Sequence, residues 1–141
     1  MHTVIFACVH SAGRSQMAAA FFNALADPTR ARAIAAGTQP AERVHPEVVE
    51  TMREIGLDLV AATPTRLTAE LAGEAQLLVT MGCGESCPIV PGLRREDWTV
   101  ADPKGQSAER VRAIRDDVRG RVERLVAAEG WQRNRADTAA R

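Results

Sequence analysis

The sequence predicts an α/β sandwich, in which helices cover both faces of a parallel sheet. Short apolar runs typical of buried strands alternate along the chain with the spacing typical of amphipathic helices. The length of 141 residues suits one domain with a core of its own. Because such sheets bind ligands beyond the carboxyl ends of their strands, reactive residues that follow a strand are candidates for a site.

The first half of the chain predicts two strands and two helices. Residues 3–7 and 31–36 are short runs of β-branched and small apolar residues, which indicate buried strands. Apolar residues at helical spacing predict a helix between them, and Pro28 marks its end. Pro46 suits the first turn of a second helix, and Gly56 is a plausible C-terminal cap for it.

The second half predicts the remaining strands and a long helix. Residues 57–61, 77–81 and 98–100 are further strand predictions. Residues 82–97 contain Gly and Pro and are predicted to form a loop. From Ser107 onward, apolar residues three and four positions apart predict a long amphipathic helix.

The composition limits the possible functions. Eighteen Lys and Arg balance eighteen Asp and Glu, so we expect neither nucleic-acid nor membrane binding. No apolar run approaches the ~20 residues of a membrane span, and the start lacks the pattern of a secretion signal, which predicts a cytoplasmic protein. We predict one domain over residues 1–131, a frayed tail over 132–141, and a monomer.

A loop that could bind an oxyanion lies between the first predicted strand and the first helix. Backbone N–H groups of such a loop can surround a tetrahedral anion, and Arg14 can bind two of its oxygens. The same positive surroundings favour the thiolate of Cys8, a nucleophile that the Ser15 hydroxyl can hydrogen-bond. A structural cysteine beside a solvated arginine explains this spacing less well. The predicted oxyanion-binding residues are Val9, His10, Ser11, Ala12, Gly13, Arg14 and Ser15.

Two more cysteines, Cys83 and Cys87, follow the predicted strand over 77–81. Three cysteines cannot form a closed set of disulfides, and the histidines lack the spacing of a zinc site, so we predict no metal and no tightly bound cofactor. A relay between thiols explains the presence of three cysteines better than a disulfide framework or a zinc site does. If Cys8 forms a covalent oxyanion adduct, a second thiol can displace the reduced product and a third can carry the disulfide away.

The loop sequence Cys-x5-Arg-Ser and the late Asp102-Pro103 resemble the low-molecular-weight protein tyrosine phosphatase family. The resemblance covers about residues 3–128 of the sequence. It implies a three-layer sandwich with a four-stranded parallel sheet, and it implies that Asp102 is a general acid. Two reactions stay open on these residues alone, phosphate-ester hydrolysis and arsenate reduction.

Two features favour arsenate as the substrate. Lys-Gly at residues 104–105 stands where the phosphatases carry aromatic residues, and the chain has no Tyr to flank an aryl phosphate. With Cys83 and Cys87, the chain resembles the arsenate reductases of this phosphatase-like class. That resemblance implies attack of Cys8 on arsenic, proton donation by Asp102, and a disulfide that passes from Cys8–Cys83 to Cys83–Cys87.

The resemblance leaves the electron donor open. Thioredoxin is one option, and a small thiol such as mycothiol or bacillithiol with a glutaredoxin-like protein is the other. The short spacing from Cys83 to Cys87, together with His10, resembles actinobacterial members of the class, some of which use mycothiol. Ser11 stands where the family commonly has Asn, which leaves open a monovalent-cation site that depends on that Asn.

Three other functions stay open beside the relay. In the first, an external small thiol attacks the Cys8 adduct, as in an arsenate–mycothiol transferase. In the second, the protein is a low-molecular-weight protein tyrosine phosphatase, which the shared loop and Asp102 support. In the third, the protein is a non-catalytic oxyanion or redox sensor that binds arsenate or phosphate without turnover.

Overall fold

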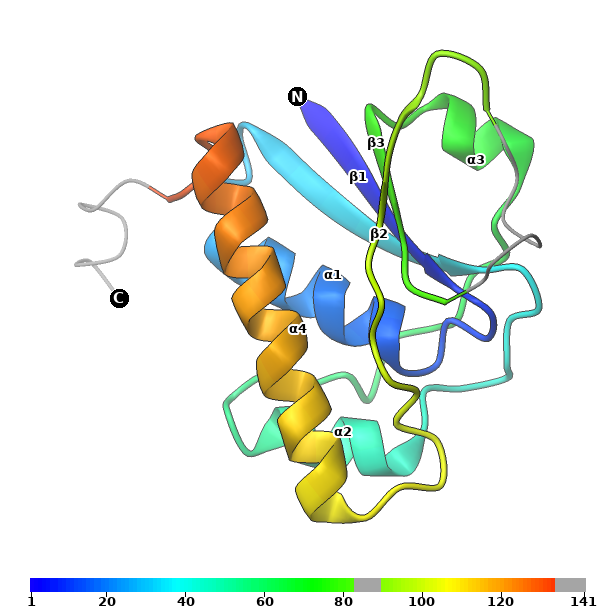
Figure 1. Cartoon of the computed structure of the whole chain (residues 1–141), viewed down its shortest axis with the longest axis vertical. Helices are drawn as coiled ribbons and strands as arrows, with labels where there is room; N and C mark the ends of the chain where they lie inside the picture. Colours follow the sequence, from blue (N-terminus) through cyan, green and yellow to red (C-terminus); the bar gives the residue numbers. More distant parts are fainter. Residues whose placement is uncertain (83–89, 134–141) are drawn as a thin grey trace.

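Four parallel strands form the single sheet of the computed structural model, which describes residues 1–82 and 90–133. The strands are β1 (His2–Cys8), β2 (Ala31–Gly37), β3 (Leu77–Thr80) and β4 (Arg94–Asp97). Their order is β2-β1-β3-β4, and every neighbouring pair is parallel. Figure 1 labels the first three strands of the chain, β1, β2 and β3. The predicted α/β fold with a four-stranded parallel sheet is confirmed.

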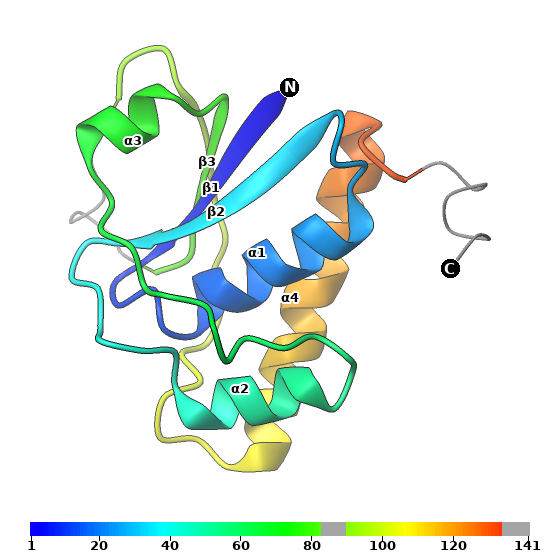
Figure 2. The same ribbon diagram turned by 180° about the vertical axis from the view of Figure 1, so that it is seen from behind.

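Helices cover the two faces of the sheet unequally. The helices α1 (Arg14–Leu25), α2 (Pro46–Arg53) and α4 (Ala108–Glu129) share one hydrophobic cluster on the first face. The short helix α3 (Ala69–Gly73) lies on the opposite face, as the front and back views show (Figures 1 and 2). The predicted three-layer sandwich is therefore the observed architecture.

The central strand β1 explains the unbroken apolar run at the start of the sequence. Val4 and Phe6 pack into the cluster beneath α1 and α4, while Ile5 and Ala7 pack into the cluster beneath α3. All four are fully buried, because a parallel strand with both faces covered has no solvent side. Cys8 at its carboxyl end is also buried.

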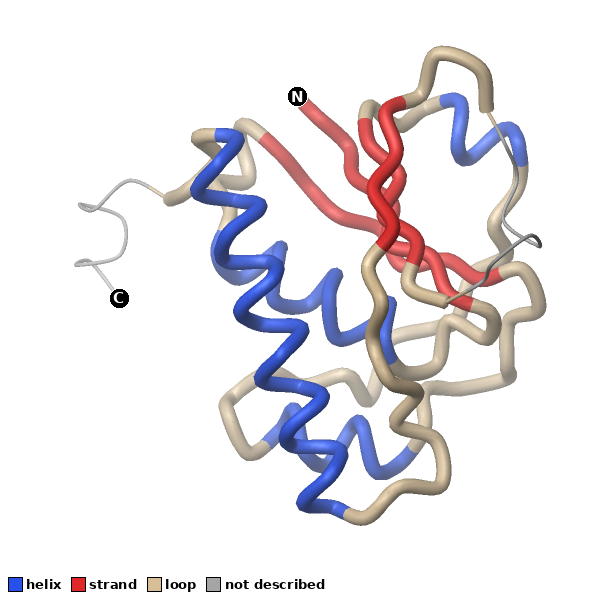
Figure 3. Tube along the Cα trace, in the orientation of Figure 1, coloured by secondary structure: helices blue, strands red, loops and turns tan. Residues whose placement is uncertain are grey.

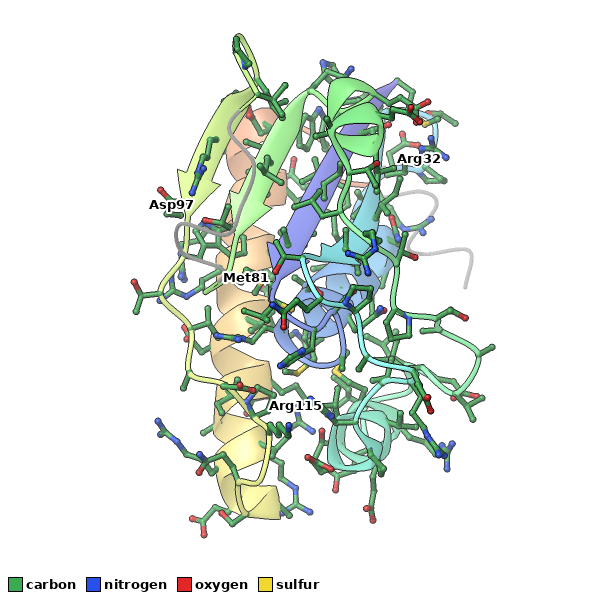
Figure 4. The ribbon with its side chains drawn as sticks, turned by 90° about the vertical axis from the view of Figure 1, so that its right-hand side faces the viewer. Arg32, Met81, Asp97 and Arg115 are labelled. Carbon is green, nitrogen blue, oxygen red and sulfur yellow. The ribbon has the colours of Figure 1, made fainter. Side chains whose placement is uncertain are left out.

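The long helix α4 begins where the sequence predicted. The Ser107 hydroxyl accepts the backbone N–H of Arg110 at 3.2 Å, which satisfies one of the free donors at the helix start. Gly130 ends the helix in a left-handed conformation with φ of 71°. Arg115, labelled in Figure 4, joins α4 to α2 by donating to the carbonyl of Thr51 at 2.8 Å.

Two strand predictions are wrong. Residues 57–61 form no strand and lead into a turn at residues 60–61, where the Asp58 carboxylate accepts the backbone N–H of Val60 at 2.9 Å. The side chain of Val60 is 68% exposed, so the apolar run does not reflect a buried strand. Residues 98–100 follow a strand and do not form one.

The last strand lies inside the segment that we predicted as a loop. β4 has the sequence Arg-Arg-Glu-Asp and stands at the edge of the sheet, where three of its four residues are exposed. A polar edge strand lacks the apolar pattern on which sequence prediction depends. The five-residue helix α3 was also missed, because one helical turn shows no periodicity.

The first residues of the predicted tail are docked on the domain. Gln132 forms a β-bridge with Ala26, and the Arg133 guanidinium donates to the carbonyls of Ala24 and Asn23 at 2.9 and 3.0 Å. Residues 134–141 lie outside the described residues. Within residues 1–82 and 90–133, no helix is long and apolar enough to cross a bilayer.

A carboxylate joins the edge strand to its neighbour. Asp97, labelled in Figure 4, accepts hydrogen bonds from the Thr80 hydroxyl and from Arg95. The bond from Thr80, followed by that from Arg95, lowers the pKa of Asp97 below its ordinary value of 3.8. A lowered pKa contributes stability that is present above the unfolded-state value and is lost as the pH falls through the folded-state value.

We therefore expect Asp97→Asn to lower the melting temperature at neutral pH, with the difference from wild type closing below a pH of about 4. Thermal melts of both proteins across this range measure the difference. Asp117→Asn, which breaks an exposed ion pair with Arg121 on α4, is the control and should have little effect. A difference for Asp97→Asn that stays constant down to acidic pH would contradict the expectation.

Candidate active site

In a parallel sheet with this strand order, ligands bind beyond the carboxyl ends of β1 and β3. From β1 the chain continues through α1 to β2 on one side, whereas β3 lies on the other side. The connections therefore separate at this point and leave a crevice beyond the strand ends. Figure 3 shows the loops that gather there. Cys8 is the last residue of β1, and Arg14 is the first residue of α1.

The segment over residues 38–45, which follows β2, holds the Cys8–Arg14 loop from outside. Four of its backbone N–H groups donate to loop carbonyls: Thr38 to Cys8 at 3.3 Å, Gln39 to Val9 at 2.8 Å, Ala41 to His10 at 2.9 Å, and His45 to Ala12 at 2.9 Å. In the described part of the chain, the N–H groups of residues 9–14 donate to no other protein group. These N–H groups are therefore available to an oxyanion, and their binding of one stays a prediction.

The nucleophile candidate lies at the base of this loop. Cys8 is 2% exposed, and its sulfur lies 3.1 Å from the Ser15 hydroxyl oxygen. The Ser15 oxygen lies 3.3 Å from the Ser11 hydroxyl oxygen, so the three side chains form a connected row. Ser11 has a φ of 51°, a left-handed conformation in which Asn is more common than Ser.

Arg14 is positioned by contacts from two other loops. Its guanidinium donates to the carbonyl of Val100 at 3.3 Å and lies 3.8 Å from the Asp102 carboxylate. Gly82, two residues after β3, has no side chain, and a Cβ there would lie 2.3 Å from Nη1 of Arg14. The structure thus brings the loop, Arg14 and Asp102 together from segments far apart in the sequence.

The Asp102-Pro103 pair docks on the oxyanion loop. Pro103 is buried, and a Cβ on Gly13 would lie 2.8 Å from its ring. One carboxylate oxygen of Asp102 accepts the backbone N–H of Lys104 at 3.0 Å, which shapes the turn. The side chain of Asp102 is 48% exposed, so it can exchange protons with water while it lies beside the loop.

Other predicted residues take different positions. His10 turns outward and its Nδ1 donates to the carbonyl of Gln39 at 3.0 Å. Cys83 and Cys87 lie outside the described residues, so the predicted relay geometry stays a prediction. Sequence reasoning missed Gln16, which is 6% exposed and lies against Ser11, because a single polar residue in a helix gives no signal of its partner.

The residues around Ser11 do not fit a monovalent cation. Both Ser11 oxygens lie within hydrogen-bond distance of the Gln16 amide nitrogen, at 2.9 Å for the carbonyl and 3.3 Å for the hydroxyl. A donor therefore stands where a cation would need to approach. Among the described residues, no group of three or more His, Cys, Asp or Glu side chains is arranged to hold a metal ion. The prediction that none is needed stays a prediction.

The geometry agrees with the comparison of the chain with known families. The model of the family named low molecular weight phosphotyrosine protein phosphatase matches residues 3–136, which is nearly the whole chain. The chain belongs to this family. Several members of the low-molecular-weight phosphatase family that resemble it are arsenate reductases, which confirms the resemblance predicted from the sequence.

Three relatives illustrate this likeness. A protein of Halobacterium salinarum, provisionally named an arsenate reductase, is 40% identical over 83% of this chain and 85% of its own. The glutaredoxin arsenate reductase of Synechocystis is 34% identical over 90% of this chain and 98% of its own. The structure of the thioredoxin-dependent arsenate reductase of Corynebacterium glutamicum superposes with a TM-score of 0.78 at 34% identity, covering 91% of this chain and 61% of that one.

The contact between Gly82 and Arg14 allows a direct test of the oxyanion loop. We expect Gly82→Ala to push the guanidinium out of place and to weaken the binding of inorganic phosphate by about tenfold, because a charge-assisted hydrogen bond is lost. Isothermal titration calorimetry measures this affinity.

Gly92→Ala is the matched control, because Gly92 also has a positive φ, of 81°, but a Cβ there would meet nothing within 4 Å. Both variants should lose stability from backbone strain, and only Gly82→Ala should lose phosphate affinity. Equal affinities in the two variants would show that Arg14 does not depend on Gly82.

Proposed function

We propose that this protein reduces arsenate to arsenite, with Cys8 as the nucleophile. The observation that carries the proposal is the placement of the Cys8 sulfur at the base of a loop whose backbone N–H groups have no protein acceptor among the described residues. Arg14 adds a positive charge at the same place. The arsenate reductases among the relatives support arsenate as the oxyanion.

In the first step, the Cys8 thiolate attacks the arsenic atom of bound arsenate and an As–O bond breaks. The N–H groups of residues 9–14 and the Arg14 guanidinium hold the remaining oxygens. Asp102 gives a proton to the departing hydroxyl group, which leaves as water, and its exposure lets it recover a proton from solvent. The product is a covalent Cys8–arsenic(V) adduct.

In the second step, the Cys83 thiolate attacks the sulfur of Cys8. The electron pair of the sulfur–arsenic bond passes to arsenic, which leaves as arsenite, and a Cys8–Cys83 disulfide forms. Cys87 then attacks Cys83 and releases Cys8 as a thiolate, leaving a Cys83–Cys87 disulfide. Two electrons reach arsenic and two thiols are oxidised, so the step balances without a metal or a bound cofactor.

A reductant must then restore the Cys83–Cys87 dithiol. Thioredoxin and a glutaredoxin-like protein are the two candidates, and relatives of both kinds are known. The proposed role in the cell is arsenic detoxification. The cytoplasmic location predicted from the sequence stays a prediction, as does the monomeric state.

The phosphatase alternative is less well supported by the site. The aromatic side chains of the described residues pack in the core: Phe6 lies 5.6 Å from Trp98 between ring centroids, and Phe22 lies 5.8 Å from Trp131. None of these rings is left to flank an aryl phosphate beside Asp102. Weak hydrolysis of small phosphate esters is still expected, because the same loop binds both oxyanions.

The decisive experiment uses the fully reduced protein, arsenate and no external reductant. Arsenite is quantified, and the disulfides are mapped by mass spectrometry. We expect about one arsenite per protein and a Cys83–Cys87 disulfide. In the Cys83→Ser variant arsenite release should stop, and adding mycothiol or bacillithiol should not restore it.

Two outcomes would change the assignment. If only the addition of a small thiol produces arsenite, the protein is an arsenate–thiol transferase and the internal relay is wrong. If no arsenite forms under any of these conditions while phosphate or arsenate binds, the proposed reduction is wrong, and the phosphatase and the oxyanion sensor are the two alternatives that remain.

A further inference from the structure

Gln16 is a buried polar residue that the proposed mechanism does not use. It lies in the first turn of α1 and is 6% exposed. Its amide nitrogen lies 2.9 Å from the carbonyl oxygen and 3.3 Å from the hydroxyl oxygen of Ser11. Because a carbonyl oxygen can only accept, the nitrogen end of the Gln16 amide must face Ser11. Gln16 therefore acts as a donor to Ser11.

The row of side chains continues from Ser11 to the nucleophile. The Ser11 hydroxyl lies 3.3 Å from the Ser15 hydroxyl, which lies 3.1 Å from the Cys8 sulfur. The side chains of Gln16, Ser11, Ser15 and Cys8 thus form a chain of four groups, which we call the Gln16–Cys8 chain. One end, the amide nitrogen, only donates, and the other end only accepts once Cys8 is a thiolate.

The direction of the hydroxyl protons depends on the state of Cys8. When Cys8 keeps its proton, it can donate to Ser15, and Ser15 to Ser11. The Ser11 oxygen then accepts from both Ser15 and Gln16, and the Ser11 proton has no acceptor among the contacts of the described residues. When Cys8 is a thiolate, Ser11 donates to Ser15 and Ser15 donates to the sulfur. Every proton of the chain then has an acceptor.

We propose that Gln16 is a positioning residue that orients the Ser11 and Ser15 hydroxyls toward Cys8 and thereby stabilises its thiolate. The inference rests on the proposed role of Cys8 as the nucleophile. According to this proposal, the uncharged amide of Gln16 helps to prepare the Cys8 sulfur for attack. The same amide also holds the carbonyl of Ser11, whose left-handed φ of 51° shapes the loop.

Other groups also act on the Cys8 sulfur, so the test must hold them constant. Arg14 and its carboxylate partner Asp102 lie at the mouth of the loop, and His10 and His45 lie on its outer side. A change at Gln16 removes none of these groups. Replacing Gln16 with Met keeps the length of the side chain and removes the donor, which isolates the amide.

The experiment measures the rate at which iodoacetamide alkylates Cys8 as a function of pH, with the Cys8 peptide followed by mass spectrometry. We expect Gln16→Met to move the midpoint of this profile to higher pH and to slow alkylation about three- to tenfold below the midpoint. Above the midpoint the two rates should agree, because the thiolate is fully formed in both proteins.

A double-mutant cycle tests the path of the effect. Ser15→Ala removes the last donor to the sulfur and should shift the midpoint at least as far as Gln16→Met. If Gln16 acts through Ser15, the double variant should show no further shift beyond Ser15→Ala. Asn23→Ala is the matched control, because Asn23 also lies on α1 and bonds the backbone of Ala33 through its amide, remote from Cys8.

An unchanged alkylation profile in a folded Gln16→Met protein, or fully additive shifts in the double variant, would overturn the inference. If Gln16→Met does not fold, Gln16→Asn keeps the amide but shortens its reach, and the same shift is expected. The alkylation profile does not require arsenate. A wild-type protein that fails to reduce arsenate would therefore disprove the proposed function without deciding the role of Gln16.

Discussion

Replacing Arg14 with Lys should lower kcat/KM for arsenate by about 100- to 1000-fold while the protein stays folded. The guanidinium presents parallel N–H groups that match two oxygens of a tetrahedral anion, whereas an ammonium offers one point of contact. Its position is also determined by the Val100 carbonyl and the Asp102 carboxylate, which lie 3.3 and 3.8 Å from it. A lysine ammonium cannot make both of these contacts, so its positive charge would be present but out of position.

Steady-state arsenite release and the affinity for inorganic phosphate measure this loss. Arg112→Lys is the matched control, because Arg112 makes two-point contact with the Glu54 carboxylate on the surface, with its nearest bonds at 2.8 and 3.0 Å. The same chemical change should there leave activity intact. A loss of less than fivefold in Arg14→Lys would show that the positive charge suffices and that bidentate geometry is not used.

Adding a single methyl group at Gly37 should lower activity strongly, because it would displace the oxyanion loop. A Cβ at this residue would lie 2.7 Å from the Val9 carbonyl oxygen and 2.8 Å from the Ser11 amide nitrogen. Both atoms belong to the backbone of the oxyanion loop, so no side chain can rotate away. We expect Gly37→Ala to cost about 1–3 kcal/mol of stability and to lower kcat/KM about 100-fold, because the loop must shift to relieve the overlap.

The control for this prediction is Gly73→Ala in α3, where a Cβ would meet nothing within 4 Å. That variant should be neutral or slightly more stable, with unchanged activity. Urea unfolding gives the stability and arsenite release gives the activity. A Gly37→Ala protein with wild-type activity would show that the oxyanion loop tolerates displacement and does not need the close approach of β2.

The sequence was most informative where the chemistry is local. Cys8 and Arg14 are separated by five residues between a strand and a helix, so their spacing alone brings thiol and guanidinium to one loop. The central strands were equally clear, because a parallel strand buried on both faces is a continuous apolar run. Asp102 was predicted because it follows an expected strand and because the family resemblance implies a general acid there. Its distance from Arg14 along the chain gives no sign of their proximity.

Other parts were decided by hydrogen bonds that the pattern of apolar residues does not show. β4 carries charged residues, yet it forms a strand because its backbone pairs with β3 and the Thr80–Asp97 hydrogen bond joins their ends. Residues 57–61 are apolar enough for a strand, but a turn at Asp58 exposes Val60. For β4 the deciding partner is a neighbouring strand, which the local sequence does not reveal. For residues 57–61 the deciding contact is a local one, because the Asp58 side chain accepts the Val60 N–H and favours a turn over a strand.

The site shows the same division. The residue types that hold an oxyanion can be recognised from the sequence, because thiol, guanidinium and carboxylate each have a definite chemistry. Their preparation for reaction is a tertiary property: among the described residues, the segment after β2 accepts no loop N–H but donates to the loop carbonyls, Gly37 lets the loop backbone lie close to β2, and Gln16 faces Ser11. Hydrogen-bond direction and close backbone approach depend on distances of a few tenths of an ångström, which only the packed fold determines.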